Sequence, residues 1–247
     1  MTRRPWRAVW SLALLAACSA PGAGLPPPQP GVVTVLPGSG MLDARLLRPG
    51  VSSYRWVMER GGEAVPAGSV TDSLSATVHE GRPALARTQV ARRGNTGLVD
   101  RSISLVRSLA PRSHRSQQPR RTVALDFDGR RVTGSVAEAG GQPVPFDTTV
   151  AVPVFDAANL DLLVRALPLR EGLAARFPVF DRDNGGLLWY SVRVAGTDRL
   201  DAGEAWRVEA QMGGTRSILW VDRATRALAR MEAEIQPGVV LRQLPVQ

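Results

Sequence analysis

Two histidines and two closely spaced aspartates are the first residues to consider for chemistry in this sequence. His79 and His114 are the only histidines, and neither belongs to an HExxH motif or a Cys/His cluster, the patterns that hold zinc. We therefore predict that both lie on the surface or in turns. Asp126 and Asp128 could supply a general acid and base, but Gly129 follows them directly. We expect these carboxylates to shape a hairpin turn.

Residues 181–186 (DRDNGG) begin like a calcium-binding loop. Calcium needs six to eight oxygen ligands, and the EF-hand pattern places a bidentate Glu at its twelfth position. That position here is Val192, so a polar turn between strands is the better interpretation. The sequence also has no GxSxG motif and no P-loop. We predict a protein that is not an enzyme and that carries no metal or cofactor.

Cys18 is the sole cysteine, so no intramolecular disulfide can form. It follows a basic segment (residues 1–7) and an apolar run (residues 8–17) that is shorter than the roughly 20 residues needed to span a bilayer. This is the pattern of a secretory signal, and its end, Leu15-Ala16-Ala17-Cys18, resembles the lipobox of bacterial lipoproteins. The resemblance implies a signal peptide over residues 1–17 and a diacylglycerol on Cys18. The alternative is an ordinary signal whose cysteine falls there by chance.

The residues after the cysteine bear on location. Residues 19–31 are small, Pro-rich and uncharged, which predicts that the lipidated cysteine and an extended tether together occupy residues 18–31. Ser19 follows the cysteine, whereas Asp at this position favours inner-membrane retention in Gram-negative lipoproteins. The resemblance therefore implies an outer-membrane protein that faces the periplasm if the host is Gram-negative. The first expected partner is the membrane, through the lipid anchor.

The composition is basic. The chain has 31 Lys+Arg and 22 Asp+Glu, a net charge of +9, and every base is arginine. Because Arg3, Arg4 and Arg7 lie in the predicted signal, the mature net charge is 9 − 3 = +6. Such a surface attracts anionic lipid or polymer, and export makes nucleic acid an unexpected partner. The apolar fraction of 44% is sufficient for a globular core.

Arginines cluster between residues 101 and 131, where no acid occurs before Asp126. Residues 108–121 (SLAPRSHRSQQPRR) have two prolines and little apolar content, so we predict a mobile loop. Guanidinium groups suit phosphate and carboxylate, which predicts a contact with anionic headgroups or an envelope polymer. The alternative is a solvated loop without such a role. The residues predicted to make this contact are Arg107, Arg112, Arg115, Arg120 and Arg121.

The rest of the chain alternates apolar and polar residues with a period of two, as in residues 54–58, 102–105, 122–127 and 206–209. This pattern is typical of half-buried antiparallel strands. Turn signals separate the strands at residues 61–62, 93–95, 128–129, 185–186 and 213–214, and residues 218–235 indicate a final hairpin. We predict a mainly β fold with one or two helices. It is a single domain over residues 32–247, formed by a curved antiparallel sheet or incomplete β-barrel.

Two segments break this pattern. Residues 41–48 (MLDARLLR) could form a short helix. Residues 156–167 (DAANLDLLVRAL) form a stronger helix prediction, because Asp156 can cap the start and Pro168 ends the segment. Its apolar side must be buried, so we expect this helix to lie across the concave face of the sheet.

A resemblance follows from these segments. Three segments resemble an uncharacterised branch of the lipoprotein-localisation carrier superfamily. They are residues 161–172 (DLLVRALPLREG), Phe180-Asp181 and the hairpin through Trp220-Val221-Asp222 and Leu228-Ala229-Arg230. The resemblance covers roughly residues 50–235, by strand pattern. It implies an incomplete barrel closed by helices, and several members of that superfamily carry acyl chains.

Two functions follow from this resemblance and from the charge. In the first, a monomer binds a lipid or another hydrophobic or acylated ligand in its concave face, with the helix as a lid. In the second, a structural or assembly module with a filled core docks an envelope protein or an anionic polymer through its arginine-rich surface. Aromatic residues on alternating strands fill a core by default. The residues predicted to line a ligand site in the first case are Leu163, Leu167, Trp189, Tyr190, Trp206 and Trp220.

Overall fold

The computed structural model describes residues 29–94 and 96–246. The predicted signal peptide, Cys18 and residues 18–28 of the predicted tether lie outside the described residues. Within the described part, no helix is both long and apolar enough to cross a bilayer.

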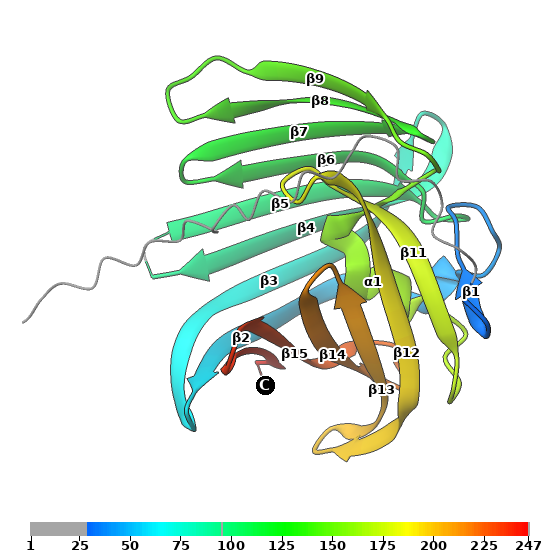
Figure 1. The fold of residues 1–247 in the computed structure, drawn as a ribbon, viewed down its shortest axis with the longest axis vertical. Helices are drawn as coiled ribbons and strands as arrows, with labels where there is room; N and C mark the ends of the chain where they lie inside the picture. The colour runs from blue at the N-terminus through cyan, green and yellow to red at the C-terminus, as the bar shows by residue number, and fades with distance from the viewer. Residues whose placement is uncertain (1–28, 95, 247) are drawn as a thin grey trace, which may run out of the picture.

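Strands make up most of the fold, in agreement with the predicted mainly β class (Figure 1). The strands are β1 (Val32–Thr34), β2 (Gly50–Arg60), β3 (Glu63–His79), β4 (Arg82–Arg93), β5 (Thr96–Leu105), β6 (Pro111–Gln118), β7 (Arg121–Asp128), β8 (Arg131–Glu138), β9 (Val144–Thr149), β10 (Phe155–Asp156), β11 (Ala174–Asp181), β12 (Gly186–Leu200), β13 (Gly203–Met212), β14 (Thr215–Asp222), β15 (Leu228–Gln236) and β16 (Val239–Pro245). The helices are η1 (Ala44–Leu46) and η2 (Ala157–Asn159), both 3-10, and the α-helix α1 (Leu160–Arg165).

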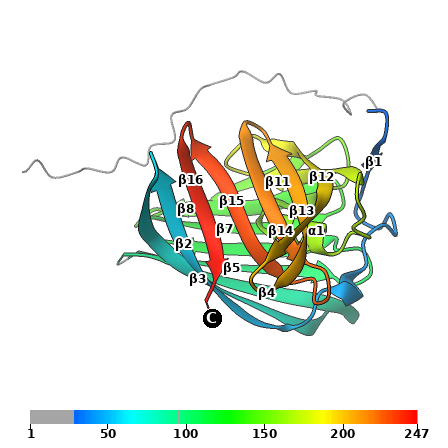
Figure 2. The same cartoon turned by 90° about the horizontal axis from the view of Figure 1, so that it is seen from below.

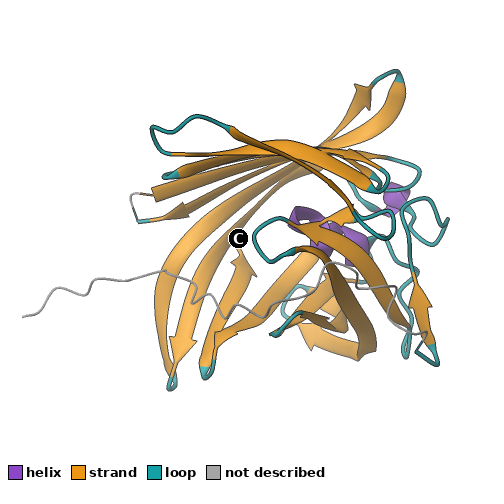
Figure 3. Cartoon of the chain, turned by 45° about the horizontal axis from the view of Figure 1, so that its top comes forward, coloured by secondary structure: helices purple, strands orange, loops and turns teal. Residues whose placement is uncertain are grey.

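The strands form one sixteen-stranded sheet in the order β1-β11-β12-β13-β14-β15-β16-β2-β3-β4-β5-β6-β7-β8-β9, with β10 paired to β11. Two antiparallel meanders, β2–β9 and β11–β16, join where β16 pairs with β2 (Figure 2). Among the strands of the described residues, only β1 and β10 pair in parallel, both with β11. Because β1 and β9 are edges and do not pair with each other, the sheet stays open. The predicted curved, incomplete barrel is confirmed (Figure 3).

The predicted turns and final hairpin are also observed. Strands end on either side of each predicted turn, and β14 and β15 form the hairpin near the C-terminus. In β7 the predicted alternation is seen directly, since Val123, Leu125 and Phe127 are buried. Local turn chemistry and period-two patterning are therefore sufficient to place most strands.

The predicted helix at residues 156–167 is present as η2 followed by α1. The Asp156 carboxylate accepts a hydrogen bond of 3.0 Å from the backbone N–H of Ala158, as the predicted cap requires. Leu163, Val164 and Leu167 are at most 1% exposed. The helix thus lies inside the curve of the sheet, between its two meanders (Figure 3). The other predicted helix, at residues 41–48, is only the single 3-10 turn η1.

The prediction of a mobile loop over residues 108–121 is wrong, because residues 111–118 form β6, which pairs with β5 and β7. Its sequence, PRSHRSQQ, is polar on both faces, so it lacks the apolar alternation that marks a half-buried strand. His114 and Ser116 nevertheless point inward and are buried. This strand faces a polar part of the interior.

The main hydrophobic core fills the space around α1. It joins both meanders to the helix, and Phe177 packs between Phe155 and Tyr190 with ring centroids 5.8 and 6.1 Å away. A second, smaller cluster forms where Phe180 of β11 meets Phe127 of β7, with centroids 6.2 Å apart. The region directly beneath the helix is therefore packed with side chains, as in a protein core.

Candidate functional site: a polar cleft between two inner faces

The two meanders present different chemistry to the interior. On β12 and β13 the inward residues are apolar, with Tyr190, Val192 and Val208 at most 4% exposed. The inner faces of β4, β5 and β6 combine apolar residues, such as Leu85 and Ala91, with polar residues that are also buried. These buried polar residues are Arg87, Ser102, Ser104, His114 and Ser116.

Arg87 is the centre of the first polar group. Its guanidinium, on a residue that is 4% exposed, donates to both Asp72 carboxylate oxygens at 2.9 and 2.6 Å and to Asp161 at 2.7 Å. It also donates to the Ala158 carbonyl at 3.2 Å. Burial alone would lower the pKa of Arg87, but Asp161 and Asp72 outweigh it and raise the pKa. The charged group therefore fixes η2 and α1 to β3 and β4.

His114 is the centre of the second polar group. The residue is 8% exposed, and its Nδ1 lies 3.2 Å from Asp156 Oδ2 while its Nε2 lies 3.9 Å from Asp100 Oδ1. Burial lowers the pKa of His114, but contact with Asp156 and the charge of Asp100 outweigh burial and raise the pKa above its usual value. The prediction that both histidines are surface or turn residues is wrong for His114, whereas His79 ends β3 beside a turn.

Backbone and amide groups hold Asp156 in place. Asn159 Nδ2 donates to its Oδ2 at 3.2 Å, in addition to the cap from Ala158. Asn159 Oδ1 in turn accepts from Ser102 Oγ at 3.1 Å. The chain Ser102–Asn159–Asp156–His114 thus connects β5, η2, β10 and β6 through the polar interior.

A cleft of about 280 Å³ opens beside His114. Arg121 and Asp183 form an ion pair at its edge, with one N–O distance of 3.0 Å. Phe180 and Met212 provide apolar lining, so the cleft lies where the polar and apolar inner faces meet. The other lining residues are Asp100, Ser116, Gln118, Val123, Leu125, Asp156, Ala157, Ala158, Asp181 and Arg182.

Several half-buried apolar side chains lie on the inner face, and one of them, Met212, also lines this cleft. Met212, Leu98, Trp56 and Met231 pack against the edge of the main core without being fully covered. Leu98 and Asp100 are two residues apart on β5 and share a face with the buried Ser102, so both point inward. Trp56 and Met231 both face Gln243 of β16, and Trp56 Nε1 donates to its side chain at 3.0 Å. A ligand with a polar end and an apolar end would find both surfaces here.

The residues predicted to line a ligand site do not form one surface. Leu163, Leu167 and Tyr190 are buried in the main core, and Trp206 packs at its margin. The two other tryptophans point to the opposite face, where Arg176 covers Trp189 at 4.9 Å and Arg230 covers Trp220 at 4.7 Å. Strand periodicity showed that aromatic residues alternate on these strands, but it did not show which face of the sheet each one occupies.

The five predicted contact arginines are also separated. Arg112 pairs with Glu80, and Arg115 pairs with Asp126 on the outer face. Arg121 instead points inward to Asp183. Arg107 and Arg120 are exposed in the turns before and after β6. Because β6 is about 26 Å long at 3.3 Å per residue, the two turns are far apart.

The calcium-like segment is a polar turn between β11 and β12. Asp181 Oδ1 accepts from the backbone N–H groups of Asp183 and Asn184 at 3.0 and 3.1 Å, so its oxygen is occupied by the turn itself. Across residues 29–94 and 96–246, no three His, Cys, Asp or Glu side chains gather as a metal site requires.

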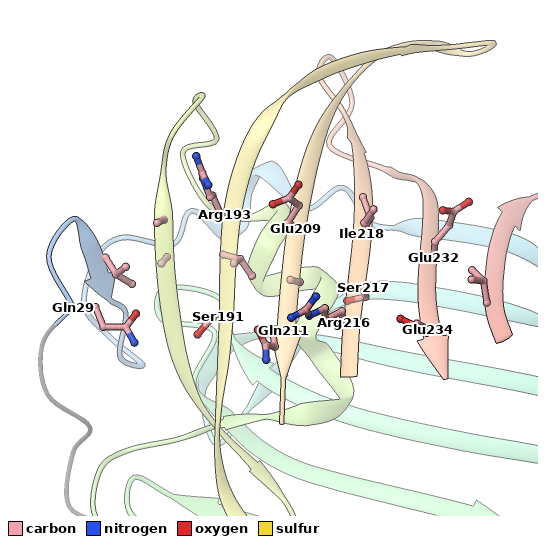
Figure 4. Close-up of a pocket in the computed structure, with 16 residues that line it drawn as sticks. Gln29, Ser191, Arg193, Glu209, Gln211, Arg216, Ser217, Ile218, Glu232 and Glu234 are labelled. Carbon is pink, nitrogen blue, oxygen red and sulfur yellow. The ribbon is translucent and has the colours of Figure 1, made fainter. Parts of the chain in front are cut away.

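A second and larger hollow, of about 660 Å³, lies on the face of β11–β16 that points away from α1 (Figure 4). Its charged lining consists of two arginines and three glutamates, so the signs are mixed. Among these groups, Glu232 already pairs with Arg230 and Arg242. The labelled charged residues are Arg193, Glu209, Arg216, Glu232 and Glu234.

Comparison with known proteins gives the family but no activity. No curated protein matches the chain. A crystal structure of a DUF1329 family protein from Desulfovibrio piger is similar over 86% of this chain and 92% of that chain, with 14% sequence identity and a TM-score of 0.32. A family described as "Protein of unknown function (DUF3108)" matches residues 53–243, which span β2 to β16 almost completely. The chain therefore belongs to the DUF3108 family.

Proposed function

We propose that this chain is a non-enzymatic lipoprotein of the cell envelope that binds a lipid or acylated amphiphile inside its half-barrel. Cys18 would hold it by a lipid anchor on the outer membrane, facing the periplasm, if the host is Gram-negative. The signal and lipobox pattern of residues 1–18 supports the location. The resemblance to the lipoprotein-localisation carrier superfamily and the open, curved sheet support the binding role.

The observation that carries the proposal is the boundary between the two inner faces. The polar cleft beside His114 meets Met212 directly, and Leu98 lies two residues from Asp100 on the same face. An acyl chain laid over the half-buried Met and Trp side chains would gain about 25 cal/mol per Å² of apolar area removed from water. Methionine adapts its shape to irregular ligands. The head of the ligand would remain in the polar cleft.

The proposed ligand lies beside the helix and not beneath it. The core under α1 is filled, and Arg87 ties the helix to β3 and β4 through Asp72 and Asp161. A helix held by a buried ion network is a fixed wall, since opening it would separate desolvated charges. The helix in this proposed site is a wall and not the predicted lid.

Native mass spectrometry of residues 29–247 tests the proposal, because the sheet and both hydrophobic clusters are complete within residues 29–246. The protein would be measured as purified, then after incubation with vesicles of phosphatidylethanolamine and phosphatidylglycerol. We expect one bound lipid or acylated molecule per chain, identified by solvent extraction. A mass equal to that of the bare chain under both conditions would overturn the proposal.

The docking alternative has one observation in its favour, the hollow on the outer face of β11–β16. Its mixed charges, from residues such as Arg193 and Glu209, suit a polar protein surface better than an acyl chain. A bare mass in the experiment above, together with a salt-sensitive complex lost in Arg193→Ala, would support this alternative. Retention of such a complex in Arg193→Ala would exclude this hollow as its site.

A further inference from the structure

Asp100 and His114 face each other in the cleft across a gap suited to one more polar atom. Asp100 Oδ1 is buried and has no hydrogen-bond partner among the described residues. The nearest cation is His114 Nε2 at 3.9 Å, which is beyond hydrogen-bond length. The two side chains are 21% and 11% exposed and both line the cleft. A buried acceptor without a partner carries a free-energy cost unless a bound group satisfies it.

A second carboxylate lies on the other side of the imidazole ring. Asp156 Oδ2 lies 3.2 Å from His114 Nδ1, and Asp156 is itself held by Ala158 and Asn159. Two carboxylates at opposite ends of the ring favour the imidazolium form, in which both ring nitrogens carry a proton. Nε2–H is then a donor 3.9 Å from Asp100 Oδ1, which is an acceptor.

We propose that Asp100 and His114 form a subsite for a hydroxyl group in the head of the bound amphiphile, such as a glycerol or sugar hydroxyl. The hydroxyl oxygen accepts from His114 Nε2–H, and its proton is donated to Asp100 Oδ1. One oxygen can lie about 2.8 Å from both atoms when they are 3.9 Å apart. This inference rests on the proposed binding function and names the chemistry of the ligand head.

The alternatives to a hydroxyl fit this pair less well. A phosphate or carboxylate would accept from His114, but it has no proton for Asp100 at neutral pH and both carboxylates would repel it. An ammonium group would donate to Asp100, but it cannot accept from Nε2–H. Arg121 does not reverse this preference, because Asp183 already neutralises it. Ser116 and Gln118, bonded to each other at 3.3 Å, offer further groups for a head with several hydroxyls.

The test compares two ligands that share an acyl chain, 1-oleoylglycerol with two free hydroxyls and methyl oleate with none. Binding to residues 29–247 would be measured by displacement of a fluorescent fatty acid. We expect the protein to prefer 1-oleoylglycerol by about tenfold, the value of two modest hydrogen bonds. Asp100→Asn and His114→Gln should each reduce that preference to below about threefold, with binding of methyl oleate unchanged.

Asp128→Asn is the matched control, because it removes an exposed carboxylate next to a turn and should keep the full preference. If His114→Gln fails to fold by circular dichroism, Asp100→Asn still decides the question. Equal affinities for the two ligands in the unaltered protein would mean that only water fills the gap, and the subsite would be overturned while the binding function stands. A preference unchanged in Asp100→Asn would also overturn the subsite. Binding of neither ligand would instead contradict the proposed function.

Discussion

The inner face of β4–β6 contains buried polar residues among its apolar ones, whereas the buried residues on the inner face of β12–β14 are apolar. Val208 and Leu219 on β13 and β14 are at most 2% exposed and pack against other apolar groups. Arg87 and Ser102 on β4 and β5 are 4% and 6% exposed and are satisfied by hydrogen bonds to η2 and α1. The short helical segment can sit between these faces because it offers Asp156, Asn159 and Asp161 to one and leucines to the other. The polar side of this helical segment therefore contacts one face of the sheet and its apolar side contacts the other, whereas the polar side of a surface helix faces solvent.

The largest expected effect is on the polar side, at its central charge. Arg87→Met leaves Asp72 and Asp161 buried without their shared cation, which should lower the free energy of unfolding by about 3–5 kcal/mol. Urea unfolding followed by circular dichroism measures this change. Arg131→Met, which breaks an exposed pair with Asp147, should lower the free energy of unfolding far less, because water screens an exposed pair. Similar losses in the two variants would show that the polar face is not held by its ion network.

A buried hydroxyl should destabilise the apolar inner face, although the polar inner face contains buried hydroxyls. Val208 is 0% exposed and lies in the main core, so Val208→Thr buries a hydroxyl and should cost about 1–3 kcal/mol. Val51→Thr, at a position that is 70% exposed, should change stability by less than about 0.5 kcal/mol. If Val208→Thr were as neutral as Val51→Thr in urea unfolding, the distinction between the two faces would fail.

The reciprocal change on the polar side should be smaller. Ser102→Ala removes the hydrogen bond from Ser102 Oγ to Asn159 Oδ1, but Arg87 still donates to that oxygen at 3.4 Å. We expect a loss of about 0.5–1.5 kcal/mol, the value of one net hydrogen bond. A double-mutant cycle with Asn159→Ala separates this coupling from the effect of each truncation. Additive losses would show that the Ser102–Asn159 contact contributes nothing on its own.

The smallest expected effect is a pH dependence at His114. Its pKa in the folded protein is raised above the ordinary value of 6.5, so the imidazolium stabilises the fold. That contribution is complete below pH 6.5 and is lost as the pH rises through the folded pKa. The charged groups that face the ring are Asp156 on β10, Asp100 on β5 and Arg115 on β6 itself. The free energy of unfolding of the wild type should therefore exceed that of His114→Gln by more at pH 6 than at pH 9. The opposite trend would contradict the raised pKa of His114.

Much of this architecture could be predicted from sequence, because apolar alternation and Gly-based turns act over short distances. They placed β7, the β14–β15 hairpin and the capped helix after Asp156. The polar strand β6 could not be recognised from apolar content, since His114 and Ser116 are buried against other polar groups. The available signal was the spacing of His114, Ser116 and Gln118 on one face, which has meaning only with a polar partner face.

The candidate site was predictable in kind but not in position. The sequence indicated a half-barrel with aromatic residues inside, yet Trp189 and Trp220 face outward under Arg176 and Arg230. Register alone decides this, because a shift of one residue moves a side chain to the other face. The cleft also combines Asp100 with Asp156 and His114, and such long-range contacts leave no local pattern.

Lipid binding by Met212→Glu tests the central claim most directly, because Met212 lines the cleft at the boundary between the polar and apolar inner faces. The introduced carboxylate would lose its hydration beneath an acyl chain, which is unfavourable. We therefore predict that the amount of co-purifying lipid per chain, measured by native mass spectrometry, falls at least about tenfold. Val78→Glu makes the same change at a position that is 70% exposed and should retain the wild-type stoichiometry. Full lipid occupancy in a folded Met212→Glu protein would contradict the account.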